Sequence, residues 1–397
     1  MARSDTHLPG GTQTGLDART LWTLLTGNAL TAIGIGFFLP ILPLFITARG
    51  GAPFLVGVVF AAGVVGRAAV QYPAGWLADR VGRRPLLLGS LLVYAAVFPL
   101  YLLPVPVAAL AGIRFVHSVA GGAFVPAAMA LAADLTPESS RGRVFSQLRA
   151  SDMVGLLLGP ALGGFVAGFR LEYVFGAGAV ICLAAALVLV GLPSTAPAQP
   201  GGTVEADLVP VRTARLLRMV LPVLVLGAPV TWTFGAYDSV WSLYLTGRGA
   251  STLVVGLSFA TYALPIVLFA GLAAGLSDRL GHLWAGRLTL ATHGLLAATY
   301  PFIASVPFLV FIGVAEGGLT AAGMPALTAE ISRRAPAGAQ GRTQGMYQLG
   351  LNTAQVAGAL VSGALYGVGA VAAFGSVAAV CLLGLAANLV ISWLRPT

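Results

Sequence analysis

The chain has 397 residues, of which 57% are hydrophobic and only 9% are charged. Soluble domains carry roughly 25% charged residues, so this composition excludes an ordinary soluble protein. The net charge of +9 does not indicate a nucleic-acid partner, because the basic residues are spread over many loops instead of forming one patch.

Twelve apolar segments follow one another along the chain, and each is long enough to cross a bilayer as a helix. They cover residues 20–47, 53–78, 85–104, 106–133, 142–168, 172–192, 216–246, 251–275, 284–304, 306–331, 342–366 and 369–394. The stretch between the sixth and seventh is rich in Pro, Gly, Ser and Thr, which is typical of a flexible linker. We therefore expect an all-α membrane protein with a six-helix N-terminal bundle (1–192), a cytoplasmic linker (193–215) and a six-helix C-terminal bundle (216–397).

The arginines predict the orientation, because cytoplasmic loops of membrane proteins are enriched in basic residues. All 22 basic residues are arginine. If the N-terminus is cytoplasmic, 16 of the 22 lie in inner loops and tails, and the outer loops hold Arg49, Arg170 and Arg248. We expect a multi-pass protein of the plasma (inner) membrane with both termini in the cytoplasm.

The two halves repeat at a constant offset of 199 residues, as a duplicated six-helix unit would. The matching pairs include Asp79 and Asp278, Pro126 and Pro325, Gly159 and Gly358, and Cys182 and Cys381. Two pseudo-symmetric halves with a site between them are typical of alternating-access transporters. The repeat therefore predicts two bundles around a central cavity.

The fifth segment contains glycines at every fourth position, which places them on one helix face where another helix can approach closely. These glycines are Gly155, Gly159 and Gly163, and Gly164 follows them. Pro160 removes one helical hydrogen bond and adds a local kink. Asp152 lies one turn earlier on nearly the same face. We interpret this segment as a tight, kinked helix contact beside a buried carboxylate.

Three carboxylates stand out in the interior of the spans: Asp152, Asp238 and Glu316. A carboxylate near the centre of a bilayer costs roughly 2.5–3.5 kcal/mol on insertion scales, so it usually has a function. We expect Asp152 and Glu316, near mid-depth, to bind protons, and we expect Asp238 to lie closer to the outside. The alternative is that these carboxylates make structural hydrogen bonds or ion pairs.

Arg114 and His117 share a span, and His117 aligns with Glu316 in the repeat. We expect both to face the central cavity, although a lone His more often packs.

The seventh segment carries an aromatic stripe at helical spacing beside one of these carboxylates. Its members are Phe234, Tyr237, Trp241 and Tyr244. Aromatic rings next to a carboxylate suit a bulky apolar or cationic ligand. The outer two rings fit equally well as residues at the membrane interface.

Three motifs together give the chain a family resemblance. The loop from Gly75 to Arg84 reads Gly-Trp-Leu-Ala-Asp-Arg-Val-Gly-Arg-Arg, the stretch from Gly155 to Gly164 is described above, and the first span contains Leu39-Pro40-Ile-Leu-Pro43. In these features the chain resembles the major facilitator superfamily, and in particular its 12-helix drug:proton antiporters. Arg114 fits the family's helix-4 arginine, but His117-Ser118 stands where the family usually has Gln-Gly.

The resemblance also implies a lock at the cytoplasmic surface. Asp79, Arg83 and Asp134, with Arg80 beside them, would form a charge cluster that docks near Arg342. There the N-terminus of the eleventh span offers the positive end of a helix dipole.

The second half differs at two of the corresponding positions. Arg83 aligns with His282, and Asp134 aligns with Arg333. That copy therefore cannot form the same cluster, and we expect the lock to be asymmetric.

The sequence has no phosphate-binding loop with Lys, no metal-like spacing of His or Cys and no nucleophile elbow, so we expect no enzyme, cofactor or metal. We predict a monomeric transporter, coupled to protons, that exports hydrophobic or amphiphilic small molecules through the lipid bilayer. One alternative is a proton symporter that imports a small metabolite such as a sugar or organic acid. Another is a membrane receptor or lipid-handling scaffold that transports nothing.

Overall fold

The computed structural model describes residues 17–193, 213–336 and 338–394, and all regular structure in these ranges is helical. The first bundle contains α1 (Ala18–Phe38), α2 (Leu42–Ala48), α3 (Pro53–Val81), α4 (Arg83–Val97), η1 (Phe98–Leu102), η2 (Val107–Ala109), α5 (Leu110–Leu135), η3 (Glu138–Ser140), α6 (Arg141–Ala167) and α7 (Tyr173–Leu189). The second contains α8 (Thr213–Gly247), α9 (Thr252–Leu268), α10 (Ala270–Leu280), α11 (His282–Thr299), η4 (Tyr300–Phe302), α12 (Val306–Arg334), α13 (Gln340–Tyr366) and α14 (Ala370–Leu394). Most of the linker proposed from the sequence lies outside the described residues.

Local sequence explains where several helices begin and end. The side chain of Asp17 accepts a hydrogen bond from the backbone N–H of Thr20 and caps α1, and Pro53 starts α3 where a missing N–H costs nothing. Gly82 has a φ of 93° between α3 and α4. Only glycine adopts this conformation readily, so it allows the chain to turn directly from one helix into the next.

Eight helical spans in the described ranges are long and apolar enough to cross a membrane, and the bent pair α9–α10 adds a ninth. When α7, α11 and α13 are added to these nine, the described chain forms twelve helical segments. α13 is less apolar because Gln344, Gln348, Asn352 and Gln355 recur along one of its sides. Of these four residues, Gln355 bonds to Arg67 of the other bundle.

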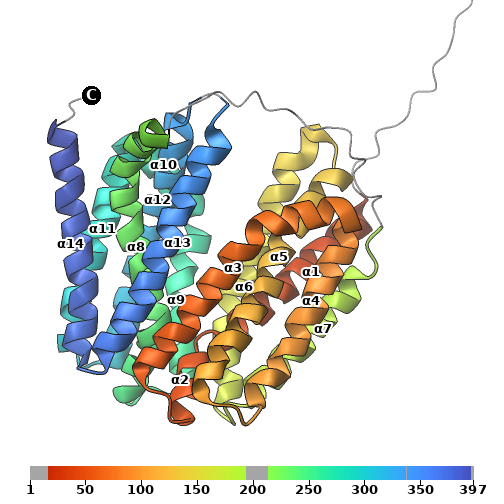
Figure 1. The fold of residues 1–397 in the computed structure, drawn as a ribbon, viewed down its shortest axis with the longest axis horizontal. Helices are drawn as coiled ribbons and strands as arrows, with labels where there is room; N and C mark the ends of the chain where they lie inside the picture. Colours follow the sequence, from red (N-terminus) through yellow and green to blue (C-terminus); the bar gives the residue numbers. More distant parts are fainter. Residues whose placement is uncertain (1–16, 194–212, 337, 395–397) are drawn as a thin grey trace, which may run out of the picture.

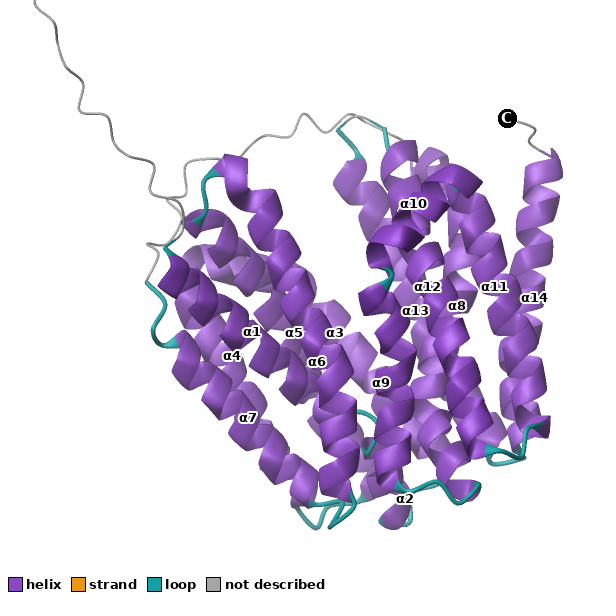
Figure 2. Cartoon of the chain, turned by 180° about the vertical axis from the view of Figure 1, so that it is seen from behind, coloured by secondary structure: helices purple, strands orange, loops and turns teal. Residues whose placement is uncertain are grey.

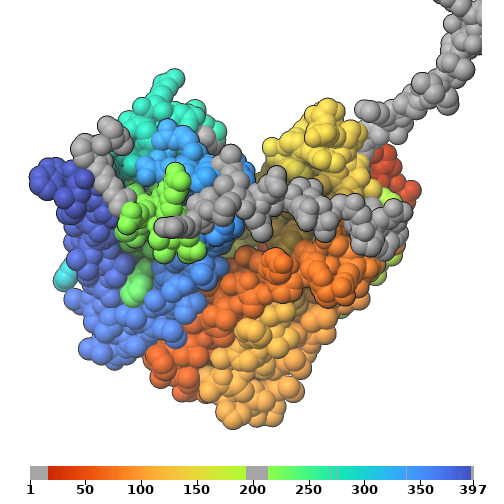
Figure 3. All heavy atoms as spheres, turned by 45° about the horizontal axis from the view of Figure 1, so that its top comes forward, coloured from red at the N-terminus to blue at the C-terminus, as the bar shows by residue number. Residues whose placement is uncertain are grey.

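The two bundles lean against each other at one end and separate at the other (Figures 1 and 2). α3 packs on α13, and α6 packs on α9. We call this the closed end. The opposite, open end carries both borders of the undescribed segment 194–212 and the end of α14 (Figure 1). The space-filling view shows a groove between the bundles at the open end (Figure 3).

Glycines allow the helices of the two bundles to touch at the closed end. A Cβ atom built on Gly57 would collide with the carbonyl oxygen of Ala359, and one built on Gly256 would collide with that of Pro160. Gly164 faces Gly256 in the same way, and the hydroxyl of Thr252 donates a hydrogen bond of 2.9 Å to its carbonyl oxygen. The closed end is therefore a contact of backbone on backbone.

Candidate functional site

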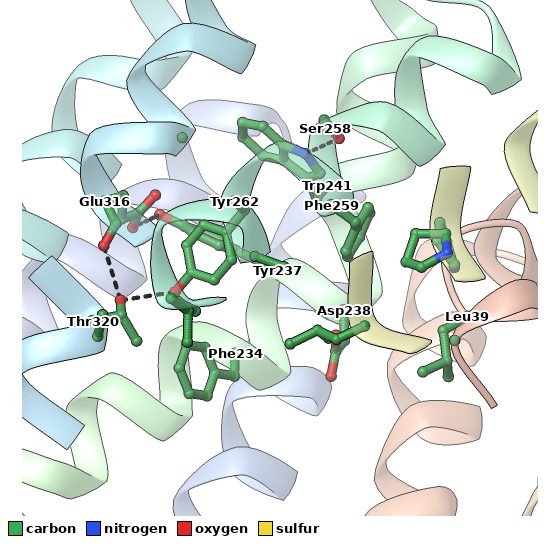
Figure 4. A pocket seen from close by; sticks show the side chains of 18 of the residues that line it. Leu39, Phe234, Tyr237, Asp238, Trp241, Ser258, Phe259, Tyr262, Glu316 and Thr320 are labelled. Carbon is green, nitrogen blue, oxygen red and sulfur yellow. Dashed lines mark hydrogen bonds between the residues drawn. The ribbon is translucent and has the colours of Figure 1, made fainter. Parts of the chain in front are cut away.

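A cavity of about 500 Å³ lies between the bundles. α8, α9 and α12 provide most of its wall. From the other bundle, Leu39 directly after α1 and Pro160 of α6 also line it. The wall is rich in aromatic rings, namely Phe234, Tyr237, Trp241, Phe259, Tyr262 and Tyr300 (Figure 4). The aromatic residues 234, 237 and 241 of α8 thus face one space, as their helical spacing requires.

Asp238 and Glu316 both line this cavity. Asp238 lies on the side nearer to Leu39 of the first bundle, whereas Glu316 lies deep in the second bundle (Figure 4). Apolar walls with two carboxylates suit an amphiphilic ligand that carries positive charge. Among the described residues, no three His, Cys, Asp or Glu side chains are grouped as a metal site requires.

Asp238 is linked to the opposite bundle through one amide side chain. Nε2 of Gln355 on α13 donates to Oδ2 of Asp238 over 3.4 Å. Oε1 of the same amide accepts a hydrogen bond of 3.3 Å from the guanidinium of Arg67 on α3. A cation of one bundle is thereby connected to a carboxylate of the other.

Glu316 is only 2% exposed and is held by neighbours from three elements. Tyr300 donates a hydrogen bond of 2.6 Å to Oε2, and Tyr237 donates one of 3.3 Å to Oε1. Nε2 of His293 on α11 lies 3.7 Å from Oε1. The carboxyl group is therefore positioned by protein groups, while one side of it remains at the cavity wall.

Asp152 does not line the cavity that contains the other two carboxylates. Its Oδ1 accepts a hydrogen bond of 2.7 Å from the buried amide of Asn28 on α1, and its Oδ2 lies 3.8 Å from Arg149. Asp152 precedes the lining residue Leu156 by four positions, so it occupies the same helix face one turn nearer the open end.

His117 does not face the central cavity as expected, and Arg114 does not line it. His117 is 0% and Arg114 is 8% exposed, and neither lines the cavity. The imidazole of His117 is enclosed by aromatic rings, with centroids 3.7 Å from Tyr94, 4.5 Å from Phe98 and 5.1 Å from Phe38. These rings fill the space around it inside the first bundle, so His117 does not reach the cavity. The guanidinium of Arg114 lies over the ring of Phe38, 5.0 Å from its centroid.

The glycine face of α6 packs against α1 within the first bundle. A Cβ atom on Gly159 would lie 2.8 Å from the carbonyl oxygen of Ile33. Gly155 and Gly163 meet the same helix one turn away on either side. Pro160, in contrast, lines the cavity, and Gly164 belongs to the closed end. One helix thus provides a tight contact, a cavity wall and an inter-bundle contact.

At the open end, Arg83 forms ion pairs with Asp79 and with Asp134, the latter over 3.2 Å. The guanidinium of Arg80 stacks on the ring of Trp76 at 3.9 Å. Arg342 lies in the first turn of α13, in the other bundle. Because the bundles are apart at this end, docking of the cluster on α13 stays a prediction for the opposite conformation.

The second half has a charge cluster of its own, built from different residues than the cluster of the first half. The ring of His282 lies 3.3 Å from Asp278 and 3.2 Å from Glu330. Glu330 also binds Arg333 and Arg334, each over 2.6 Å. Glu330 supplies the acid that Asp134 supplies in the first half, but from a different helix position. An alignment of position against position therefore misses it.

Several site residues escaped the sequence analysis because they are neutral or common in packed helices. They are Asn28, Tyr262, Tyr300 and Gln355. The repeat contained a usable signal for Tyr300, since Tyr101 aligns with it at the same offset of 199 residues. The two amides gave no signal, because their role depends on a partner in another helix.

Comparison with known proteins agrees with this architecture. A model of the Major Facilitator Superfamily matches residues 24–245 and 223–397. The chain is 30% identical to the class E tetracycline resistance protein of Escherichia coli over 88% of each chain. It is 25% identical to multidrug resistance protein 2 of Bacillus subtilis, over 88% of this chain and 90% of that protein.

Solved structures share the fold at low sequence identity. A nucleoside transporter, NupG, superimposes with a TM-score of 0.80 at 14% identity, over 94% of this chain and 99% of that one. A peptide transporter, POT, superimposes with a TM-score of 0.76 at 19% identity, over 94% of each chain. With two bundles around a cavity and a family model that matches nearly the whole chain, this protein belongs to the major facilitator superfamily.

Proposed function

We propose that this protein is a proton-coupled exporter of hydrophobic or amphiphilic small molecules that works by alternating access. The observation that carries the proposal is the aromatic cavity between the two bundles, with Asp238 and Glu316 in its wall. The names of the relatives, which are tetracycline and multidrug resistance proteins, support export over import.

The open end faces the cytoplasm in this proposal, as the distribution of arginines predicts. Both termini and the linker (193–215) between the bundles (1–192 and 216–397) are then cytoplasmic, and the structure corresponds to the inward-open state of a monomer in the inner membrane. Import of one proton down 100 mV supplies about 2.3 kcal/mol, which supports a substrate gradient of roughly fifty-fold.

Coupling follows from the two environments that the cavity carboxyls meet. A carboxyl group surrounded by apolar side chains favours its protonated form, whereas water or a nearby cation favours the ionised form. Protons enter when the cavity faces outward, and they leave when Asp238 and Glu316 meet cytoplasmic water or a substrate cation. Asp152, on the same face of α6 as Leu156, exchanges protons at the entrance.

The Asp79–Arg83–Asp134 cluster closes the cytoplasmic end in the outward-open state. It docks near Arg342 at the N-terminus of α13, where the helix dipole favours a carboxylate. The glycine contact between α6 and α1 keeps the first bundle rigid, so that it rocks as one body.

Transport into everted membrane vesicles tests the proposal. An acid-inside pH gradient should drive a fluorescent lipophilic cation such as ethidium into vesicles that contain the wild-type protein. Vesicles with the double variant Asp238→Asn and Glu316→Gln should show no pH-driven accumulation. Movement in the opposite direction would indicate a symporter. Binding without any flux would indicate a receptor or scaffold.

A further inference from the structure

His293 stands directly behind Glu316, away from the cavity. It is 0% exposed, and its Nδ1 lies 2.8 Å from the carbonyl oxygen of Thr289. A carbonyl oxygen only accepts hydrogen bonds, so Nδ1 carries a proton. The other ring nitrogen, Nε2, faces Oε1 of Glu316 at 3.7 Å and the hydroxyl of Thr320 at 3.3 Å.

Both protonation states of His293 have a partner in this arrangement. When the ring is neutral, Nε2 accepts a hydrogen bond from the Thr320 hydroxyl. When it is protonated, Nε2–H points toward Glu316 and the oxygen of Thr320, whose own proton then goes to the main-chain oxygen of Glu316, 2.9 Å away. Tyr262 supplies a further hydrogen bond of 2.9 Å to the same hydroxyl. A buried group that alternately holds and releases a proton needs a hydrogen-bond partner in both protonation states.

The first bundle contains the same framework without the pair. At the offset of 199 residues, Phe38, Tyr94, Tyr101 and His117 correspond to Tyr237, His293, Tyr300 and Glu316. Tyr101 approaches Nδ1 of His117 at 3.3 Å, as Tyr300 approaches Glu316 at 2.6 Å. In the first bundle these positions form an aromatic enclosure around His117. In the second bundle the same positions hold a histidine and a carboxylate side by side, His293 and Glu316.

We propose that His293 is a proton-binding partner of Glu316, and that the two side chains share one proton between the cavity wall and the bundle interior. This inference rests on the proposed function. The titratable groups around the pair come from every neighbouring element: Tyr237 on α8, Tyr262 on α9, Tyr300 on η4 and Cys381 on α14. When a substrate cation approaches the carboxylate, the pair releases the shared proton through the cavity side of Glu316 to cytoplasmic water, and it takes up a proton again after the substrate has left.

The same everted vesicles test the inference with two substitutions of His293. His293→Asn keeps a donor for the carbonyl of Thr289, and His293→Gln places an amide near Nε2; neither titrates. His117→Asn is the matched control, because His117 is an equally buried imidazole in the other bundle and has no carboxylate partner among the residues that the structure describes. Transport normalised to protein amount is measured from pH 5.5 to 8.5, both with a pH gradient and as exchange without one.

A shared proton is bound more tightly than one held by Glu316 alone. Both variants should therefore lower the pH of half-maximal pH-driven transport by about one unit, which corresponds to a tenfold loss of proton affinity. Exchange without a gradient should persist, and His117→Asn should keep the wild-type midpoint. If both His293 variants keep the wild-type midpoint, the inference about His293 is overturned, but the proposed function is not. A wild-type protein without pH-driven transport would overturn the proposed function as well.

Discussion

Arg67 of the first bundle and Asp238 of the second are joined through one side chain, because the amide of Gln355 bonds to both. The link crosses the bundle interface beside the cavity. The charge of the carboxylate therefore acts directly on the contact between the two bodies that must move.

The first prediction concerns this link. Gln355→Leu removes the hydrogen bond from Arg67 that crosses between the bundles, which is worth about 1 kcal/mol. It should shift the conformational equilibrium roughly fivefold toward the state that is open at the present closed end. Distances between spin labels at Gly50 and Val368, both in turns at that end, measure the populations. Gln348→Leu is the matched control, because Gln348 lies on the same helix and bonds only to Asn352 one turn away. Equal distributions for the two variants would contradict the prediction.

The second prediction concerns the cavity carboxyls. Glu316→Gln and Asp238→Asn keep the size of each side chain but abolish its titration. Each should retain substrate binding and exchange, and lose at least about tenfold of pH-driven accumulation. Asp152→Asn should lose less, because Asp152 lies outside the cavity and Asn28 still has Ser151 as a partner at 2.7 Å. An Asp152 variant with the largest loss would reverse this ranking.

The third prediction concerns the contact between α6 and α1. A leucine at Gly159 would collide with Ile33 and Gly36, and overpacking of this kind costs roughly 1–3 kcal/mol. Gly159→Leu should therefore lower the melting temperature and slow transport. Gly176→Leu on α7 is the control, because a Cβ atom there meets nothing within 4 Å. Similar melting curves for the two leucine variants would show that the contact is not tight.

The fourth prediction concerns the charge cluster of the signature loop. The side chain of Asp79 is 58% exposed, so Asp79→Asn should leave the fold intact. It removes one of the two carboxylates that hold Arg83, and it should raise the fraction of inward-open protein and slow turnover. Distance measurements between the inner ends of α3 and α13 report this fraction. Glu138→Gln, another charge change at the same surface, should leave it unchanged.

The sequence predicted the helices and their repeat well, because many residues contribute to each long apolar segment and to the constant offset between the halves. It also indicated Asp238 and Glu316, since a carboxylate within a span is rare. It misplaced His117, because the direction of that ring depends on Phe38 and Tyr94, which come from two other spans. The link through Gln355 could not be predicted either, since the sequence does not show which partner a polar residue on a helix face will contact.

The contrast between the two ends of the molecule has a consequence for ionic strength. Backbone contacts at Gly57 and Gly256 hold the closed end together, and such van der Waals contacts are insensitive to dissolved ions. The open end carries more arginines than carboxylates on both bundles. Their repulsion over several ångströms is screened by salt, with a Debye length of about 10 Å at 0.1 M and 3 Å at 1 M. Concentrated salt should therefore favour closure of this end, and dilute buffer should favour the conformation seen here.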